Sequence, residues 1–183
     1  MLAVPVGPRD HVGGTASAPV VLVEYGDYQC PHCGRARPIV RALLEQFRGS
    51  IAFVFRNFPL ADLHPDAMRA AETAEWAALS QRFWPMHDFL FEHQRTLDPS
   101  SLLAAASHFH LDRQQLEVAW HDRALRHRIV DDMSGGLASG VRGTPTFFIN
   151  GQLHEGSWEL DDLATALRNV GAVPSHQARR GQT

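Results

Sequence analysis

The chain has 183 residues, 44% of them hydrophobic, and a formal net charge of −3. This length suits one domain, or one domain with a sizeable insertion. The negative charge argues against a nucleic-acid-binding surface, and no apolar run is long enough to span a membrane. Residues 1–10 lack the charged and apolar regions of a signal peptide. The sequence as it stands is typical of a cytoplasmic protein, or of an extracytoplasmic one whose leader has been removed.

A strand, a helix and a second strand are predicted near the N-terminus. Residues 1–19 are rich in Pro and Gly, and we expect an extended lead-in there. The apolar run Val20–Tyr25 predicts a buried strand, and the run Ile51–Phe55 predicts another. Between them Pro31–Phe47 has the pattern of a helix, with Pro31 in its first turn. Because the spacing is that of a βαβ unit, the two strands should be parallel.

Between residues 61 and 142 the sequence predicts helices and no strand. Apolar spacing and capping residues give His64–Ser80, Arg82–His93, a helix capped by Asp98, a helix capped by Asp112, and Asp122–Ser139. Strand signals return in Thr144–Ile149, and Asn150-Gly151 is a strong hairpin signal. The chain then gives a return strand over 152–155, a helix over Trp158–Val170 capped by Ser157, and a polar tail from Pro174 that we expect to be disordered.

The two cysteines, Cys30 and Cys33, are the strongest chemical signal in the sequence. They follow the first predicted strand, and Pro31 marks the start of the next helix, so Cys30 falls at a helix N-terminus. Unpaired backbone N–H groups and the positive end of the helix dipole favour a thiolate there. His32, if protonated, would add to that effect. A CxxC pair in this position predicts redox chemistry.

Two other roles of the cysteine pair compete with redox chemistry. A structural disulfide would close a loop of only four residues, which stabilises a fold by roughly 2 kcal/mol. A structural zinc site needs four ligands, usually from two such pairs, and the chain has no second pair. The eleven histidines include no HxxxH pair. We therefore favour redox chemistry and expect no bound metal or cofactor.

The order of these motifs resembles that of the DsbA-like thiol-disulfide oxidoreductases. The resemblance rests on Cys-Pro-His-Cys at Cys30–Cys33, on Gly-Thr-Pro-Thr-Phe-Phe-Ile-Asn-Gly at 143–151, and on the helical segment between them. It implies an α/β thioredoxin fold, a central mixed sheet built β-α-β and then β-β-α, with an inserted all-helical domain. The expected division is 1–60 and 143–172 for the thioredoxin domain, 61–142 for the helical insertion, and 173–183 for the tail.

The resemblance assigns roles to residues around the cysteines. Cys30 would be the attacking cysteine, and Cys33 would be the buried resolving one. Pro145 matches the family's cis-proline, which packs against the disulfide; an ordinary trans-proline in an edge strand is the alternative. Thr144, just before it, would present its backbone to a substrate peptide. Binding would then occur by strand addition, which is largely independent of the substrate's sequence.

Glu24 and the dipeptide between the cysteines are expected to tune the site. Glu24 lies where the family keeps a buried acid, which could exchange a proton with the resolving cysteine. A surface acid at a strand end is the alternative, and Asp27 is the local competitor. Pro31 and His32 form the pair found in strongly oxidising relatives, whose reduced form has a stabilised thiolate. We expect the pKa of the attacking cysteine to lie well below that of a free thiol, with His32 supplying much of the shift.

The sequence therefore predicts an enzyme that exchanges disulfides with cysteine-containing protein substrates through a mixed disulfide at Cys30, as a dithiol oxidant. A redox partner would recycle the Cys30–Cys33 couple, and we expect a monomer without a nucleic-acid partner. The alternative is a thioredoxin-fold module that senses redox state or docks a partner with little turnover. A glutathione-using relative is disfavoured, because such proteins commonly keep a single Ser or Cys. The direction of electron flow is decided by the reduction potential of the couple and by the compartment's partner enzyme.

Overall fold

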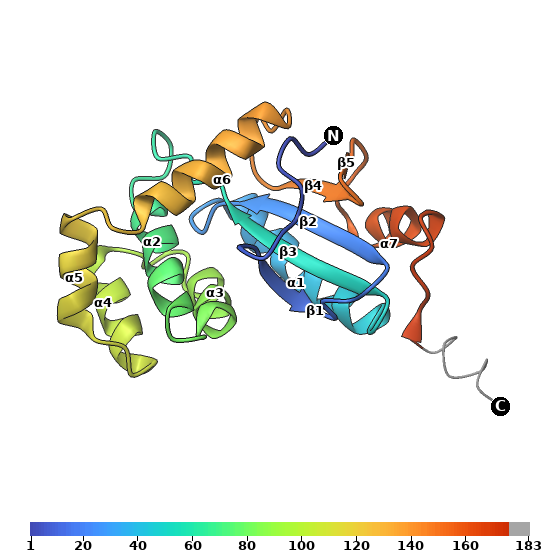
Figure 1. Cartoon of the computed structure of the whole chain (residues 1–183). Helices are drawn as coiled ribbons and strands as arrows, with labels where there is room; N and C mark the ends of the chain where they lie inside the picture. The colour runs from blue at the N-terminus through green and yellow to red at the C-terminus, as the bar shows by residue number, and fades with distance from the viewer. Residues whose placement is uncertain (176–183) are drawn as a thin grey trace.

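A computed structural model describes residues 1–175 of the chain (Figure 1). Its centre is a mixed sheet in the order β1-β3-β2-β4-β5. The strands are β1 His11–Gly14, β2 Val20–Gly26, β3 Ile51–Asn57, β4 Thr146–Ile149 and β5 Gln152–Leu153. β2 and β3 are parallel, as the βαβ spacing predicts, and β4 and β5 form the predicted antiparallel hairpin. The predicted α/β fold, with a mixed sheet built β-α-β and then β-β-α, is confirmed.

The sequence does not predict the edge strand β1. His11–Gly14 pairs antiparallel with β3 and completes the sheet at that edge. These four residues are extended, as expected for the lead-in over residues 1–19, but they form a paired strand that was not predicted. Gly13 and Gly14 hide the strand from pattern analysis, because glycine is depleted in strands.

Both faces of the sheet are covered by other elements. Phe55 of β3 packs in the larger hydrophobic core, whereas its neighbour Val54 packs in a smaller core on the opposite face. On β2, Val23 and Tyr25 belong to the smaller core. Because side chains alternate along a strand, Glu24 between them faces the larger core. Burial on both faces makes β2 and β3 nearly continuous apolar runs, which is why the sequence predicts them.

The described residues form seven helices. They are α1 Pro31–Gln46, α2 Ala67–Ala78, α3 Phe83–Glu92, α4 Pro99–His108, α5 Arg113–His121, α6 Arg126–Ala138 and α7 Leu160–Asn169. α1 and α7 pack together against the larger core, and α6 crosses the opposite face, while α2 to α5 lie as a group beside the sheet (Figure 1). None of the described helices is long and apolar enough to cross a membrane. Whether α2 to α6 form a separate domain stays a prediction.

Capping residues set two helix starts as predicted, and a third prediction is wrong. The carboxylates of Asp98 and Asp112 accept hydrogen bonds from backbone N–H groups in the first turns of α4 and α5. At α7 the predicted cap, Ser157, lies two residues too early. The N-cap is Glu159, whose backbone N–H donates to the Ser157 hydroxyl over 3.1 Å. Of the predicted tail, residues 176–183 lie outside the described part of the chain.

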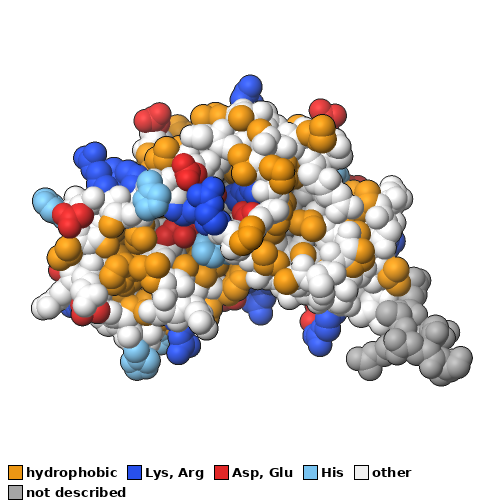
Figure 2. All heavy atoms as spheres, viewed as in Figure 1, with side chains coloured by type: hydrophobic (Ala, Val, Ile, Leu, Met, Phe, Trp, Pro, Cys, Tyr) orange, Lys and Arg blue, Asp and Glu red, His pale blue; other side chains and the backbone are white. Residues whose placement is uncertain are grey.

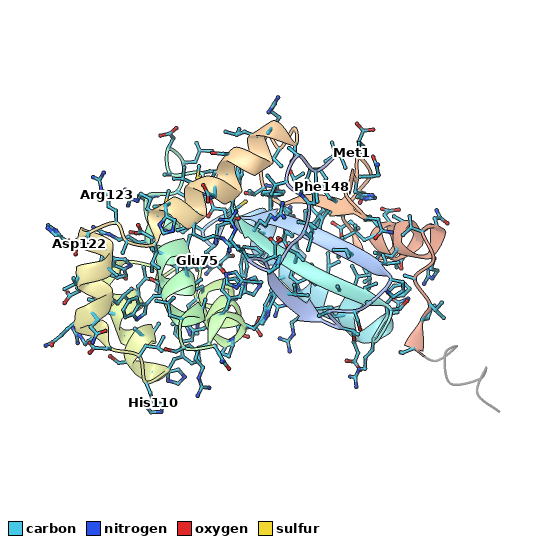
Figure 3. All side chains as sticks on the ribbon, viewed as in Figure 1. Met1, Glu75, His110, Asp122, Arg123 and Phe148 are labelled. Atoms are coloured by element: carbon cyan, nitrogen blue, oxygen red, sulfur yellow. The ribbon has the colours of Figure 1, made fainter. Side chains whose placement is uncertain are left out.

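Buried polar contacts attach the helical group to the sheet. Glu75 of α2 accepts a hydrogen bond of 2.8 Å from the Asn57 amide and lies 3.0 Å from Nε2 of His11 in β1. Figure 3 shows Glu75 where the helices meet the sheet, and His110 and Asp122 at the outer edge of the helical group. The orientation of the helices is therefore fixed by groups on both β1 and β3.

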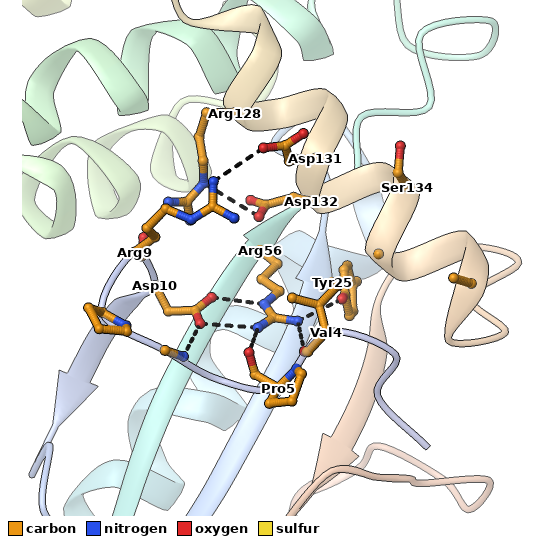
Figure 4. A pocket seen from close by; sticks show the side chains of 14 residues that line it. Val4, Pro5, Arg9, Asp10, Tyr25, Arg56, Arg128, Asp131, Asp132 and Ser134 are labelled. Atoms are coloured by element: carbon orange, nitrogen blue, oxygen red, sulfur yellow. Dashed lines mark hydrogen bonds and ion pairs between the residues drawn. The ribbon is translucent and has the colours of Figure 1, made fainter.

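A cavity of about 570 Å³ lies on the α6 face, between that helix and the N-terminal segment (Figure 4). Its central group is Arg56, only 3% exposed. The guanidinium donates to both carboxylate oxygens of Asp10, to the Tyr25 hydroxyl, and to two carbonyl oxygens of the N-terminal segment. In Figure 2 basic and acidic side chains lie side by side near the middle of this face. These contacts hold the N-terminal segment against the sheet, so we interpret the cavity as structural.

Candidate active site

The two cysteines lie at the N-terminus of α1, on the larger-core side of the sheet. Cys30 is the N-cap residue, with φ −68° and ψ 119°, and Pro31 is the first helical residue. A tight turn after β2 leads to this position, closed by a hydrogen bond of 3.1 Å from the Cys30 N–H to the Asp27 carbonyl. Both cysteines are free thiols; Cys30 is 4% exposed and Cys33 is fully buried. Cys30 is thus the thiol nearer to the surface.

The loop that precedes β4 faces the Cys30 thiol. The peptide bond between Thr144 and Pro145 is cis, as the resemblance implies. The Cys30 thiol donates a hydrogen bond to the Thr144 carbonyl oxygen over an Sγ–O distance of 3.3 Å. The Thr144 hydroxyl is buried and has no hydrogen-bond partner within residues 1–175. The sequence-predicted residues therefore come together from two distant segments.

The surroundings separate the pKa values of the two thiols. A hydrogen bond from the Cys33 thiol lowers the pKa of Cys30 to about 5, although burial opposes this effect. The backbone N–H groups of Cys33 and His32 add to the lowering. Burial raises the pKa of Cys33 well above its usual range, and Cys30 and Glu24 raise it further. Near neutral pH only Cys30 is therefore a thiolate.

Glu24 is buried in the larger core beneath the cysteines. The residue is 2% exposed, and its Oε1 atom has no hydrogen-bond partner in the described part of the chain. Burial raises the pKa of Glu24 to about 8, opposed by Arg37 and assisted by Cys30. The alternative of a surface acid at a strand end is wrong. A carboxyl group with such a pKa can hold or release a proton near neutral pH.

Asp27, the competing acid, is occupied by the turn before α1. One of its carboxylate oxygens accepts a hydrogen bond of 2.7 Å from the Gln29 N–H. The other accepts one of 2.8 Å from the Leu60 N–H and lies 2.7 Å from Nδ1 of His64. These contacts tie the turn to the segment after β3. Of these two acids, only Glu24 therefore keeps an oxygen without a partner in residues 1–175.

The His32 side chain is exposed, and its Nδ1 lies 2.8 Å from a guanidinium nitrogen of Arg35. Because a guanidinium only donates hydrogen bonds, Nδ1 is the acceptor in this pair. The Arg35 guanidinium in turn lies over the Trp158 ring, 5.5 Å from its centroid. It is the backbone N–H of His32, and not its ring, that contributes to the lowered pKa of Cys30. These contacts do not support the prediction that the imidazole supplies much of the shift.

Gln94, in the segment between α3 and α4, is a site residue that the sequence does not predict. Its Nε2 donates to the carbonyl oxygens of Tyr28 and Cys30 over 2.7 and 2.9 Å. A Cβ atom on Gly34 would clash with Oε1 of Gln94, so glycine lets the Gln94 amide lie in this position. The helical group thus contacts the active-site turn directly. An isolated glycine inside the predicted helix is the one sequence signal of such a close approach.

The buried histidine nearest to the turn is a core residue. The Tyr28 hydroxyl lies 3.1 Å from Nδ1 of His87, which packs among the rings of α3 and β3. Burial lowers the pKa of His87 well below its usual range, so the ring is neutral. Within residues 1–175, no group of three or more His, Cys, Asp or Glu side chains is placed to hold a metal ion.

Comparisons with a family model and with solved structures agree with this fold. A family model described as thioredoxin matches residues 7–169. A thioredoxin-like oxidoreductase from Silicibacter pomeroyi is 26% identical with a TM-score of 0.79, over 89% of this chain and 92% of its own. BdbD from Bacillus subtilis is 24% identical with a TM-score of 0.78, over 87% and 91% of the two chains. α-DsbA1 from Wolbachia pipientis is 23% identical with a TM-score of 0.78, over 92% and 94%.

Curated relatives of higher identity carry a different kind of name. The Na(+)/H(+) antiporter NhaA 1 of Salinispora arenicola is 47% identical over 172 residues, which are 93% of this chain and 26% of the relative. The antiporter of the same name from Mycolicibacterium vanbaalenii is 40% identical over 166 residues, 89% of this chain and 27% of the relative. The chain spans about a quarter of the length of these relatives.

Proposed function

Because the chain belongs to the thioredoxin family, we propose that it exchanges disulfides with protein substrates through a mixed disulfide at Cys30. The observation that carries the proposal is the separation of the two thiols. The pKa of Cys30 is lowered to about 5 and that of Cys33 is raised well above its usual range. One sulfur is therefore ready to attack or leave as a thiolate, and the other acts from a buried position.

In the oxidising direction, a substrate thiolate attacks the Cys30 sulfur of the Cys30–Cys33 disulfide. That disulfide breaks, the Cys33 sulfur leaves and takes up a proton, and the substrate is joined to Cys30. A second substrate thiolate then attacks the substrate sulfur of the mixed disulfide, and Cys30 leaves as a thiolate. The substrate has lost a pair of electrons, which the protein holds as its dithiol. A redox partner must then reoxidise the couple.

The stabilised thiolate of Cys30 favours this direction. A disulfide whose reduced form is stabilised is a stronger oxidant, because its reduction releases a thiolate that gains favourable contacts. The hydrogen bond from the Cys33 thiol and the donors around Cys30 exist in the dithiol form. We therefore propose a dithiol oxidant, with the compartment's partner deciding the net flow.

Glu24 supplies the proton that Cys33 needs in this scheme. Its carboxyl group is protonated below a pKa of about 8 and has an oxygen without a partner in the described residues. A buried thiolate at Cys33 is unfavourable because of desolvation, so a nearby proton donor speeds its departure. In the reverse direction the carboxylate accepts the proton from Cys33. Glu24 is thus proposed as the general acid and base of the resolving step.

The loop at Thr144 and Pro145 is proposed to bind the substrate backbone. It lies at the start of β4 and faces the Cys30 sulfur, which is 3.3 Å from the Thr144 carbonyl oxygen. An extended substrate segment can add to the backbone here as a further strand. Such binding would hold the substrate cysteine beside Cys30 while leaving its side chains free for other contacts.

A second candidate function is a docking or redox-sensing module with little turnover. The likeness to antiporters of which the chain spans about a quarter favours it. In that case the thiol pair would report redox state to a membrane partner instead of turning over many substrates. The reactive cysteine would be the same, so the two candidates differ in turnover and not in the site.

Reduction of insulin disulfides and oxidative refolding of a reduced protein test the proposal. The wild type should accelerate both, and Cys30→Ser should reduce the rate to the uncatalysed level. Cys33→Ser should instead trap the mixed disulfide, seen as a covalent adduct that dithiothreitol releases. Equal rates for wild type and Cys30→Ser would refute an enzymatic role and leave the docking module.

A further inference from the structure

A second cavity, of about 400 Å³, lies beside the cis-proline loop and not on the α6 face. Thr144 and Pro145 form one wall, so the cavity begins next to the carbonyl oxygen that the Cys30 thiol contacts. Trp158 forms an apolar part of the lining. Arg142 also lines it. A chain segment bound at Cys30 would therefore have its neighbouring residues over this cavity.

One arginine lines the cavity, and a second lies over the Trp158 ring. Arg142 is exposed, and its guanidinium is bonded to the carbonyl of Val141, 3.2 Å away. Arg35 is also exposed, and its guanidinium lies over the ring of Trp158, which lines the cavity. Neither makes an ion pair with a carboxylate of residues 1–175, and no described aspartate or glutamate lines the cavity. By contrast Arg37, two residues further along α1, is paired with Asp88.

We propose that this cavity selects client segments that carry acidic residues beside the reacting cysteine. The inference rests on the proposed exchange at Cys30 and names its substrate class. Guanidinium groups bind carboxylates with charge-assisted hydrogen bonds, and two guanidiniums without a carboxylate partner among residues 1–175 also attract an acidic segment before contact. Trp158 offers an apolar surface to the part of the segment between its charges. Strand addition at Thr144 supplies no such preference, because it uses the backbone alone.

Three synthetic peptides test the inference on the Cys33→Ser variant. Each has a single cysteine joined to thionitrobenzoate, and the flanking residues are glutamate, lysine or serine. The Cys30 thiolate attacks the peptide sulfur, the bond between that sulfur and thionitrobenzoate breaks, and thionitrobenzoate leaves as a coloured thiolate. Its absorbance gives the rate of each exchange. The ratio of the glutamate rate to the lysine rate is the readout, because the intrinsic reactivity of Cys30 cancels in it.

The glutamate peptide should react about tenfold faster than the lysine peptide, which corresponds to about 1.4 kcal/mol. Arg35→Glu and Arg142→Glu should each lower this ratio severalfold. Arg113→Glu is the matched control, since Arg113 is exposed at the start of α5, in the helical group. It should leave the ratio unchanged. In the unaltered cavity the ratio should also fall toward one as salt is added, which requires no substitution near the site.

Two results would overturn the inference, and they differ from failure of the proposed function. Equal and fast reaction of all three peptides would mean that the cavity does not select charge, while exchange at Cys30 stands. A ratio that is high but unaffected by Arg35→Glu and Arg142→Glu would place the selection elsewhere. If no peptide reacts faster with the protein than with free cysteine at equal thiolate concentration, the proposed function itself fails.

Discussion

Both faces of the sheet bury an ionisable side chain, but the two side chains differ in their hydrogen-bond partners. On the α6 face, the Arg56 guanidinium donates to a carboxylate, a hydroxyl and two carbonyl oxygens. On the α1 face, Glu24 keeps an oxygen without a partner among the described residues, and burial raises its pKa to about 8. A buried charge with all its partners holds a structure in place, whereas one without them can change its protonation state during a reaction.

The largest expected effect on stability comes from removing the hydrogen bonds of the Arg56 guanidinium. Arg56→Met leaves the Asp10 carboxylate buried without its partner, and such a loss typically costs about 3–5 kcal/mol. Chemical denaturation should show this drop in the free energy of unfolding. The pKa of Cys30 should stay unchanged in the folded fraction, because the two sites lie on opposite faces of the sheet. A shifted Cys30 pKa would show that the two faces are coupled, and it would contradict the view that the Arg56 contacts are purely structural.

An exposed ion pair provides the control for Arg56. Arg48, just after α1, is paired with Glu45 in the last turn of that helix, and both side chains are exposed. Exposed pairs contribute little, so Arg48→Met should leave the denaturation midpoint unchanged within error. If both arginine variants lose equal stability, the burial of Arg56 is not the reason for its effect.

Glu24→Gln should change how stability depends on pH. The ordinary pKa of this carboxyl group is 4.5, and burial raises it to about 8. Between these values the folded protein binds a proton that the unfolded chain has lost, so the wild type loses stability as pH rises, by up to about 1.4 kcal/mol per unit. The variant lacks this loss and should be the more stable protein at pH 8. Denaturation of both proteins at pH 5 and pH 8 measures it.

The same substitution should slow the chemistry. Glutamine cannot give a proton to Cys33, so the resolving step should be slower by about tenfold or more. Asp27→Asn is the contrasting variant, because the Asp27 carboxylate is occupied by the turn. It should lower stability at all pH values without removing the proton donor. Equal resolving rates in Glu24→Gln and wild type would remove Glu24 from the mechanism.

A smaller effect is expected at the contact between Gly34 and Gln94, where the helical group meets the active-site turn. Gly34→Ala pushes the new Cβ into the Gln94 amide, and overpacking of this kind typically costs about 1–3 kcal/mol. In a Gln94→Ala background the clash is gone, and alanine is favoured over glycine in a helix by up to about 1 kcal/mol. The same change should thus destabilise the wild type and stabilise the Gln94→Ala variant. A double-mutant cycle measures this reversal, and purely additive effects would contradict the contact.

The smallest expected effect is that of His32→Leu. The backbone N–H of this residue contributes to the lowered pKa of Cys30, and that group is kept in the variant. Thiolate absorbance should give a Cys30 pKa within about half a unit of the wild type, well inside the usual spread of protein pKa values. A rise of a full unit or more would restore the imidazole to the role that the sequence suggests.

The parts of the molecule that the sequence predicts are those set by local pattern. β2 and β3 are apolar runs because both faces of the sheet are covered, and the two cysteines sit at a turn marked by Pro31. Asp98 and Asp112 mark helix starts, because a cap acts on the next few residues. The motif at 143–151 identifies Pro145 as the cis-proline. Each of these features depends on residues that are close in the chain.

The features that escape prediction depend on residues far apart in the chain. Gln94 reaches carbonyl oxygens 64 and 66 positions away, and no local pattern marks a glutamine for that role. Gly135 and Gly136 weaken α6 by their helix propensity, yet a Cβ on Gly136 would lie 2.9 Å from the Phe58 ring. The glycines are there for close packing against the sheet. Similarly, the sequence suggests that the His32 imidazole lowers the pKa of Cys30, but it does not show that Arg35 lies beside this ring.

The most direct test of the account is a pH titration of thiolate absorbance in the reduced wild-type protein. A single step with a midpoint near pH 5 is predicted, from Cys30 alone, and Cys30→Ser should lose it. Cys33 should not titrate in the same range, since burial raises its pKa well above the usual value. A first midpoint near the free-thiol value of about 8.5 would contradict the account, because neither thiol would then be prepared for exchange.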